Sequence, residues 1–145
     1  MATTKRKAKK TITIPKLIQK AQKVFNAYIR ERDSKDGYFT CISCFRTLPI
    51  EKINAGHYVP VKKSSYLRFH EDNCHAECQF DNGFNEFHLI NYRKHLILKI
   101  GEERVEWLEH NQNKVHKWTR EELNNIIEKY KLDGKSETAN YDIPF

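Results

Sequence analysis

Apolar side chains recur every three or four positions near the N-terminal end of the chain. This spacing predicts an amphipathic helix over residues 15–33, because positions three and four apart share one face of an α-helix. Pro15 suits the first turn, where its missing N–H would have no helical partner. Residues 1–14 lack this periodicity and are predicted to form a basic, disordered arm. The apolar face of the helix comprises Leu17, Ala21, Val24, Phe25, Tyr28 and Ile29.

Helical spacing returns in the last part of the chain. It begins at about Asn82 and continues until a glycine ends the pattern. Residues 102–131 are predicted to form two further C-terminal helices. The second of these follows Thr119, because Glu122 three residues later completes a capping box. Residues 132–145 lack periodicity and are predicted to form a loose tail. The apolar positions of the first and last of these helices are Phe87, Ile90, Leu96, Ile97, Ile100, Leu123, Ile126, Ile127 and Tyr130.

Between these helical stretches the pattern favours short strands. Residues 38–40 are typical of a strand, and residues 46–60 are predicted to form a β-hairpin, with His57 near the start of its second strand. Residues 61–69 then form a basic, hydroxyl-rich loop. The sequence thus predicts an α+β fold in which a core of residues 37–101 is flanked by N- and C-terminal helices.

Two short motifs in this core have the spacing of zinc ligands. Two residues separate Cys41 from Cys44, which lets both sulfur atoms bind one tetrahedral Zn²⁺. Cys78 and Asp81 repeat this spacing with a carboxylate in place of the second thiolate. These four residues form the predicted structural zinc site, and a core this short gains stability from such a site.

Two neighbouring side chains keep a second zinc set open. Cys74 or His75 could replace Asp81 as the fourth ligand. Clustered cysteines without an apolar leader favour metal binding in a reduced cytoplasm over a disulfide framework. No apolar run approaches the roughly 18 residues of a membrane span. We therefore expect a cytoplasmic protein with no membrane partner.

The formal net charge of +7 is concentrated at the N-terminal end. Residues 1–24 carry eight basic side chains and no acid, which leaves the rest of the chain at −1. A basic arm favours a polyanionic partner, although an arm taken alone is equally typical of a solubilising tail. The zinc motifs behind the arm favour DNA or RNA. A second, smaller basic group comprises Lys62, Lys63, Arg68, Arg93, Lys94 and Lys99.

The order of these motifs resembles that of a known nuclease superfamily. A cysteine knuckle, a hairpin with a histidine, an asparagine, a second knuckle and a helix follow one another as in the HNH, or ββα-metal, nucleases. The strings C-I-S-C, A-G-H-Y, L-R-F-H-E-D-N-C-H-A-E-C, N-Y-R and I-G-E-E-R-V-E-W-L-E, over residues 41–109, are similar to those of the phage NinG/Rap recombination proteins. The resemblance implies a zinc-stapled ββα-metal core and an endonuclease that cuts branched recombination intermediates, including Holliday junctions.

The resemblance also implies roles for individual residues. His57 matches the histidine whose neutral imidazole takes a proton from the attacking water. Asn73 matches the asparagine that orients the loop of this histidine. Asn82 matches the last motif position, whose oxygen donor helps to hold a catalytic Mg²⁺ or Mn²⁺, and His88 is a second candidate ligand. Many members carry an aspartate immediately before the histidine, where this chain has Gly56.

The glycine leaves the ligand set of the catalytic cation incomplete. The acids that could supply the missing carboxylate are Glu71, Asp72 and Glu86. Basic side chains of the loop and of the following helix are expected to contact DNA phosphates, which positions the DNA without reading its sequence. These side chains are Lys62, Lys63, Arg68, Arg93 and Lys94.

These observations together favour a metal-dependent endonuclease that binds branched DNA. A junction presents two symmetric strands, so a homodimer is expected to place two sites for paired cuts. The apolar faces from Leu17 to Ile29 and from Leu123 to Tyr130 are candidate dimer contacts, unless each covers its own core. One alternative is a catalytically silent, zinc-stabilised DNA-binding module, and another is an HNH nuclease that cuts ordinary duplex DNA.

Overall fold

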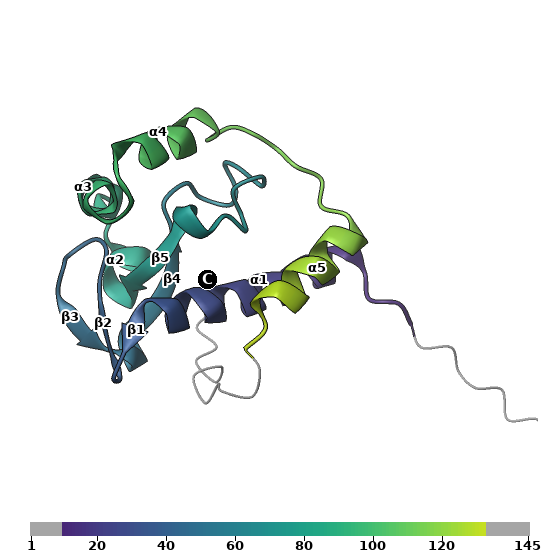
Figure 1. The fold of residues 1–145 in the computed structure, drawn as a ribbon, viewed down its shortest axis with the longest axis horizontal. Coiled ribbons are helices and arrows are strands. Elements are labelled where there is room, and N and C mark those ends of the chain that lie inside the picture. The colour runs from purple at the N-terminus through teal and green to yellow at the C-terminus, as the bar shows by residue number, and fades with distance from the viewer. Residues whose placement is uncertain (1–9, 133–145) are drawn as a thin grey trace, which may run out of the picture.

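A computed structural model describes residues 10–132, so most of the predicted arm and tail lies outside the described residues (Figure 1). Helix α1, Ile14–Arg32, confirms the helix predicted near the N-terminus. The Thr13 side chain accepts a hydrogen bond from the backbone N–H of Lys16 and caps the helix, and Pro15 lies in the first turn. Within the described residues no helix is both long and apolar enough to cross a bilayer.

Helix α1 packs against the last described helix, α5, which spans Arg120–Tyr130 (Figure 1). The predicted capping box is present between Thr119 and Glu122. Phe25 of α1 meets Tyr130 of α5 edge-on, with ring centroids 5.0 Å apart. The two apolar faces therefore cover the molecule's own core and are not available as the dimer contacts considered above.

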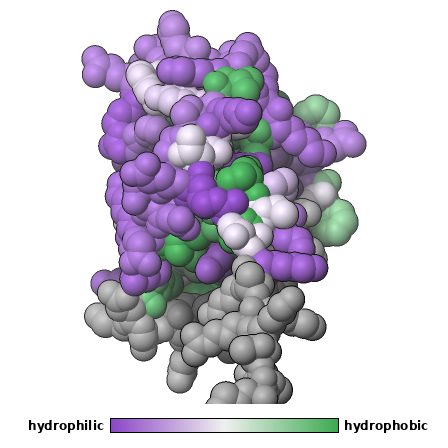
Figure 2. Space-filling view, turned by 90° about the vertical axis from the view of Figure 1, so that its right-hand side faces the viewer, coloured by the Kyte–Doolittle hydropathy of each residue, from purple (hydrophilic) through white to green (hydrophobic). Residues whose placement is uncertain are grey.

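The end face of the molecule in Figure 2 is mainly hydrophilic, with hydrophobic residues in smaller areas.

Three short strands follow α1 and form an antiparallel sheet in the order β1-β2-β3. Strand β1 spans Ser34–Lys35, β2 spans Tyr38–Thr40 and β3 spans Thr47–Pro49. Strand β2 confirms the strand predicted from the sequence. The turn between β2 and β3, residues 41–46, carries the first cysteine pair.

The second sheet corrects the hairpin predicted over residues 46–60. Strand β4, Ile53–His57, pairs antiparallel with β5, Cys74–Cys78, whereas β3 belongs to the first sheet. A 3₁₀ turn at Ile50–Lys52 separates β3 from β4, so the two strands do not pair with each other. His57 consequently lies at the end of its strand rather than near the start, and it faces Cys74 across the ladder.

Three helices follow the β4–β5 hairpin: α2, Gln79–Phe84; α3, His88–Ile100; and α4, Glu102–His110. The single helix predicted from Asn82 is thus divided into α2 and α3. Gly101 ends α3 with a positive φ of 90°, a conformation that glycine adopts without steric cost.

The hairpin lies between helices on its two faces. Cys74 belongs to the core that β4 and β5 share with α1, whereas the Tyr92 hydroxyl of α3 donates a 2.6 Å hydrogen bond to the Gly56 carbonyl. Phe87 and Ile90, two apolar positions of the predicted helix, are exposed. The structure confirms a mixed α+β fold with helices around small sheets.

Candidate functional site

Three cysteines and one aspartate converge close to the first turn of α2. The ligand atoms of Cys41, Cys44, Cys78 and Asp81 all lie within 4.8 Å of one another. The turn after β2 brings the first pair together, because the Phe45 N–H donates to the Cys41 carbonyl oxygen at 2.9 Å. Phe45 itself has a positive φ of 60°, which is uncommon for a bulky side chain.

The geometry of this cluster suits a zinc ion. Cys41 Sγ accepts the backbone N–H groups of Cys44 at 3.5 Å and Cys78 at 3.2 Å, which favours a thiolate. The Asp81 Oδ1 atom accepts an amide N–H from Asn85 at 3.2 Å, while Oδ2 lies 3.2 Å from Cys78 Sγ. Three sulfur ligands and one oriented carboxylate form a set that can hold zinc.

The protonation states of these ligands differ. Burial raises the pKa of the Cys41 and Cys78 thiols. Burial alone would also raise the pKa of Asp81, but hydrogen bonds from Asn85 and from the thiols outweigh it and lower that pKa. Metal binding at this cluster therefore releases protons from sulfur, while the carboxylate is already ionised.

The two alternative zinc ligands lie outside the cluster. Cys74 Sγ is 3.9 Å from His57 Nδ1. The His75 ring places Nε2 2.8 Å from the Asp72 carbonyl oxygen and Nδ1 3.2 Å from a guanidinium nitrogen of Arg32. The structure therefore brings together the predicted ligand set and not a set that includes either alternative.

His57 closes strand β4, where the loop of residues 58–73 begins. Its Nε2 lies 3.1 Å from the Arg68 carbonyl oxygen. A carbonyl oxygen can only accept, so Nε2 carries the ring proton and Nδ1 has a lone pair. The 3.9 Å separation from Cys74 Sγ is too long for a strong hydrogen bond to Nδ1. Burial lowers the pKa of His57 to about 4, and the nearby Arg68 charge acts in the same direction.

Asn73 holds the loop that contains Arg68. Its buried side chain accepts the Val59 N–H at 2.8 Å and donates to the Val59 carbonyl at 3.0 Å. The same amide group lies 3.4 Å from the Leu67 carbonyl oxygen, and the Asn73 carbonyl accepts the Tyr58 N–H at 2.9 Å. The two ends of the loop are therefore fixed beside His57, and Asn73 is placed to orient the loop rather than to contact a ligand.

Arg68 differs from the other basic side chains predicted to contact DNA. The residue is half-buried, and its Nε atom is buried without a hydrogen-bond partner. Burial lowers the pKa of its guanidinium. None of the ion pairs found between residues 10 and 132 neutralises it. An unpartnered cation beside His57 is suited to bind an anion from solution.

The remaining predicted DNA contacts are more ordinary surface groups. Arg93 forms an ion pair with Glu109, with the closest N–O distance 2.9 Å. The Lys63 ammonium donates to the Gln112 side chain at 2.6 Å. Two further lysines are exposed, Lys62 and Lys94. These four side chains therefore give the loop and α3 a basic surface without a buried, unpaired charge.

The candidate ligands for a catalytic cation lie on α2 and α3. Asn82 is half-buried on α2, and His88 begins α3. His88 Nδ1 lies 2.6 Å from Oε2 of Glu77 on β5. Glu77 was not among the residues predicted from the sequence. Gly56 was the sign of this contact in the sequence, because a residue without a side chain leaves room for a carboxylate from the neighbouring strand.

The three acids predicted as possible carboxylate ligands of the catalytic cation do not lie beside His88. Glu71 accepts a hydrogen bond from the Tyr28 hydroxyl at 3.0 Å. Asp72 is paired with the guanidinium of Arg104. Glu86 is exposed to solvent. Glu71 and Asp72 are therefore committed to structural contacts, and none of the three is found in contact with His88.

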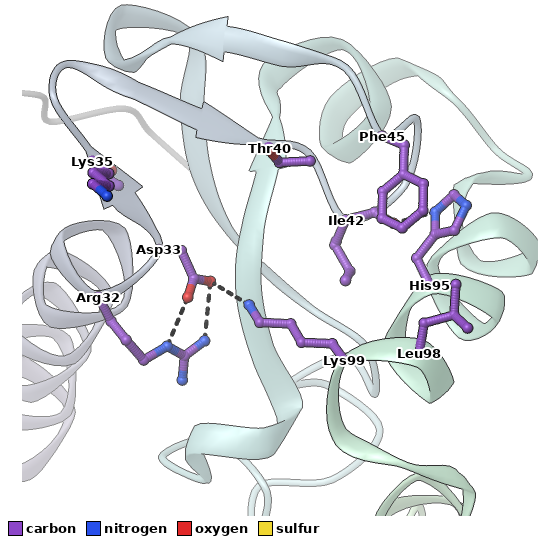
Figure 3. A pocket seen from close by; sticks show the side chains of 10 residues that line it. Arg32, Asp33, Lys35, Thr40, Ile42, Phe45, His95, Leu98 and Lys99 are labelled. Atoms are coloured by element: carbon purple, nitrogen blue, oxygen red, sulfur yellow. Dashed lines mark hydrogen bonds and ion pairs between the residues drawn. The ribbon is translucent and has the colours of Figure 1, made fainter.

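A pocket of about 450 Å³ lies beside the first cysteine turn, a feature for which the sequence showed no pattern (Figure 3). Asp33 in this pocket accepts from Arg32 at 2.9 Å and from Lys99 at 3.1 Å. Burial would raise the pKa of Asp33, but these two cations lower it to about 2. The Phe45 ring stacks on His95 with centroids 3.6 Å apart. The network ties the end of α1 to α3, and Arg32 and Lys99 share the single carboxylate of Asp33.

The chain is similar to proteins of several phages. Residues 1–139 match the profile of a family described as Bacteriophage Lambda NinG protein. The NinG protein of Escherichia phage lambda is 42% identical over 113 residues, which cover 78% of this chain and 53% of the relative. The NinG protein of Salmonella phage P22 is 38% identical over 128 residues, covering 84% and 61%. The chain spans about half the length of the curated relatives it matches. No solved structure gives a significant match.

Proposed function

The chain belongs to the NinG family of bacteriophage proteins, and we propose that it is a metal-dependent endonuclease that cuts branched DNA during phage recombination. One observation carries the proposal: a neutral histidine and an unpartnered cation lie together at the end of the β4–β5 hairpin. His57 has the lone pair of its ring on Nδ1, 3.9 Å from the Cys74 sulfur, and Arg68 has a buried Nε without a partner. Phosphodiester hydrolysis needs a base for water and a group that binds the phosphate.

The order of elements around this pair supports the same proposal. An antiparallel hairpin is followed by helices, and a cysteine-rich cluster lies at the opposite end of β5 from His57. This order is similar to the core of HNH nucleases, in which a hairpin and a helix frame the reacting phosphate. In the proposal Asn73 is a positioning residue, because its side chain binds the loop and not the exterior.

In the proposed reaction, Nδ1 of His57 takes a proton from a water molecule whose oxygen attacks the phosphorus. The bond to the 3′ oxygen breaks, and this oxygen keeps the bonding electron pair and takes a proton from solvent. The guanidinium of Arg68 binds the non-bridging phosphate oxygens through its N–H donors. A bound phosphate also brings negative charge beside His57. That charge raises the pKa of His57 from about 4 towards neutrality, which makes the imidazole a stronger base when the substrate is present.

Asn82 and His88 would hold the catalytic Mg²⁺ or Mn²⁺ of this proposal. An amide oxygen suits both ions, and an imidazole nitrogen is a better ligand for Mn²⁺. When bound, such an ion supplies positive charge that stabilises the phosphate and the leaving oxygen. His88 retains 17% side-chain exposure, so it is reachable from solvent.

Branched DNA and a homodimer are the proposed partners. Junction cleavage requires two cuts on symmetric strands, which two copies of the site would provide. The basic surface of the loop and α3 would contact the DNA backbone. Since the apolar faces of α1 and α5 are covered by each other, a dimer would have to use another surface.

The proposal is tested by cleavage of matched four-way, flap and linear duplex substrates in the presence of Mn²⁺. We expect cuts in the four-way substrate by the wild type, and none by His57→Ala at the same protein concentration. DNA that is shifted in a gel but never cut would instead show a catalytically silent binding module. Equal cutting of all three substrates would show a nuclease for ordinary duplex DNA.

A further inference from the structure

Glu77 is the fourth of the five residues of β5 and has no exposed surface. Its Oε2 atom accepts a hydrogen bond from the Ser43 hydroxyl and lies 2.6 Å from His88 Nδ1. Its Oε1 atom is also buried, but it has no hydrogen-bond partner. Leaving a buried carboxylate oxygen unpaired is costly, so such an atom indicates a missing partner.

The backbone opposite Glu77 leaves room for its carboxylate. A Cβ atom at Gly56 would lie 2.5 Å from Glu77 Oε1 and 3.3 Å from its carboxyl carbon. These distances are too short for a side chain at position 56 to coexist with the present position of Glu77. The carboxylate therefore occupies the space that the side chain of residue 56 would otherwise take, and it reaches that space from the opposite strand.

We propose that Glu77 and His88 together hold a divalent cation, with Glu77 providing from β5 the carboxylate that position 56 of β4 lacks. The cation binds Glu77 through Oε1 and Oε2 and His88 through Nδ1, in place of the hydrogen bond that now joins them. The Ser43 hydroxyl remains close to the carboxylate as a further oxygen donor. A carboxylate, an imidazole and a hydroxyl suit Mn²⁺ or Mg²⁺ better than the sulfur-rich cluster does.

This inference rests on the proposed function for the role of the cation, but the binding is testable without DNA. Zinc-loaded wild-type protein is titrated with Mn²⁺, and the free ion is followed by electron paramagnetic resonance. We expect one Mn²⁺ bound per chain and a weakening of roughly 10–100-fold or more in Glu77→Gln. Glu86→Gln, which neutralises an exposed acid close in sequence, is the matched control and should bind Mn²⁺ like the wild type.

A relocated carboxylate gives a second test that separates loss of the ligand from loss of the fold. Glu77→Ala should abolish Mn²⁺ binding, and adding Gly56→Asp to it should restore binding, because the carboxylate then enters the same space from β4. Zinc content and circular dichroism report whether each variant is folded. Unchanged Mn²⁺ affinity in folded Glu77→Gln would overturn the proposal, as would a folded, zinc-loaded wild type that binds no Mn²⁺.

The outcomes also separate this site from the proposed nuclease activity. Mn²⁺ binding that depends on Glu77, in a protein that cuts no DNA, would support the cation site and refute the nuclease. DNA cleavage by the wild type, with Mn²⁺ binding that is indifferent to Glu77, would support the nuclease and refute this cation site.

Discussion

The two ends of strand β5 hold polar groups in opposite ways. At the Cys78 end, four ligand atoms converge on one point and can be satisfied by one ion. At the Cys74 end, His57 is held by a backbone carbonyl, and the neighbouring Arg68 has a buried nitrogen with no partner. At the first end, one metal ion would bind all four ligand atoms. At the second end, no described residue forms an ion pair with the Arg68 guanidinium. Under the proposed function, stability and reactivity are therefore placed at separate ends of the same strand.

The largest expected effect comes from removing a ligand at the Cys78 end. Cys41→Ser should lose zinc and much of the folded core, because the apparent binding free energy of a structural zinc is on the order of 10 kcal/mol and is coupled to folding. Zinc analysis and thermal unfolding measure this. Cys74→Ala, at the other end of β5, is the control and should retain one zinc per chain. Zinc loss in the control would show that the two ends share the metal, which would break the comparison.

His57→Ala should impair DNA cleavage and leave zinc binding and the fold intact. We expect cleavage to fall by roughly 10²–10⁴-fold, the usual effect of losing a general base, with zinc content and DNA affinity nearly unchanged. Single-turnover cleavage and a gel-shift titration measure the two effects. His110→Ala, which removes an exposed histidine from α4, is the matched control and should cut like the wild type. Near-normal cleavage by His57→Ala would remove His57 from the mechanism.

Arg68→Gln should weaken DNA binding and cleavage by roughly tenfold, because one charge-assisted phosphate contact contributes about 1.5–3 kcal/mol, less any gain from relieving the buried charge. Arg93→Gln should have a smaller effect, since Arg93 is already paired with Glu109. Fluorescence anisotropy with labelled junction DNA compares the two variants. An equal loss in both would show that Arg68 is an ordinary surface cation.

The last expected effect is the pH dependence that His57 confers. Its pKa is about 4 in the folded protein and near 6.5 in the unfolded chain, so the unfolded chain binds more protons between these values. The stability contributed by neutral His57 is therefore complete above about pH 6.5 and is lost as the pH falls towards 4, by roughly 1–3 kcal/mol.

Nuclear magnetic resonance titration of the imidazole measures this pKa directly. A value near 4 in the free protein and a higher value in complex with non-cleavable DNA would sharpen the comparison, because only the reactive end should respond to phosphate. A value near 6.5 in the free protein would contradict the lowered pKa of the half-buried His57.

Much of the fold was predictable from local patterns. The helices over 15–33 and after Thr119 were found because their apolar spacing and caps are local signals. Strand β5 was missed because all five of its residues are buried, so it has no alternation of polar and apolar positions. The wrong hairpin over residues 46–60 followed from this omission, since β4 had no other evident partner.

The candidate site likewise contains residues that were predictable from local patterns and residues that were not. The cysteine cluster was predictable because two-residue spacing within each half-site limits how its ligands can lie. Glu77 was not, because its surroundings depend on a glycine on the opposite strand and on a histidine from a later helix. The unpaired state of Arg68 was equally inaccessible, since charge pairing is decided by tertiary contacts rather than by sequence spacing.

The packing of α1 against α5 has a consequence for the synthesis of this chain on the ribosome. Helix α1 is complete at Arg32, but the tyrosine that packs on Phe25 is Tyr130. At translation rates of roughly 5–20 residues per second, the part of the α1 apolar face that α5 covers waits about 5–20 s for its partner to be made. Ala55, Phe69 and Cys74, which cover the rest of that face, are made earlier. Until α5 is made, the nascent chain presents a partly uncovered amphipathic helix, a surface of the kind that chaperones bind.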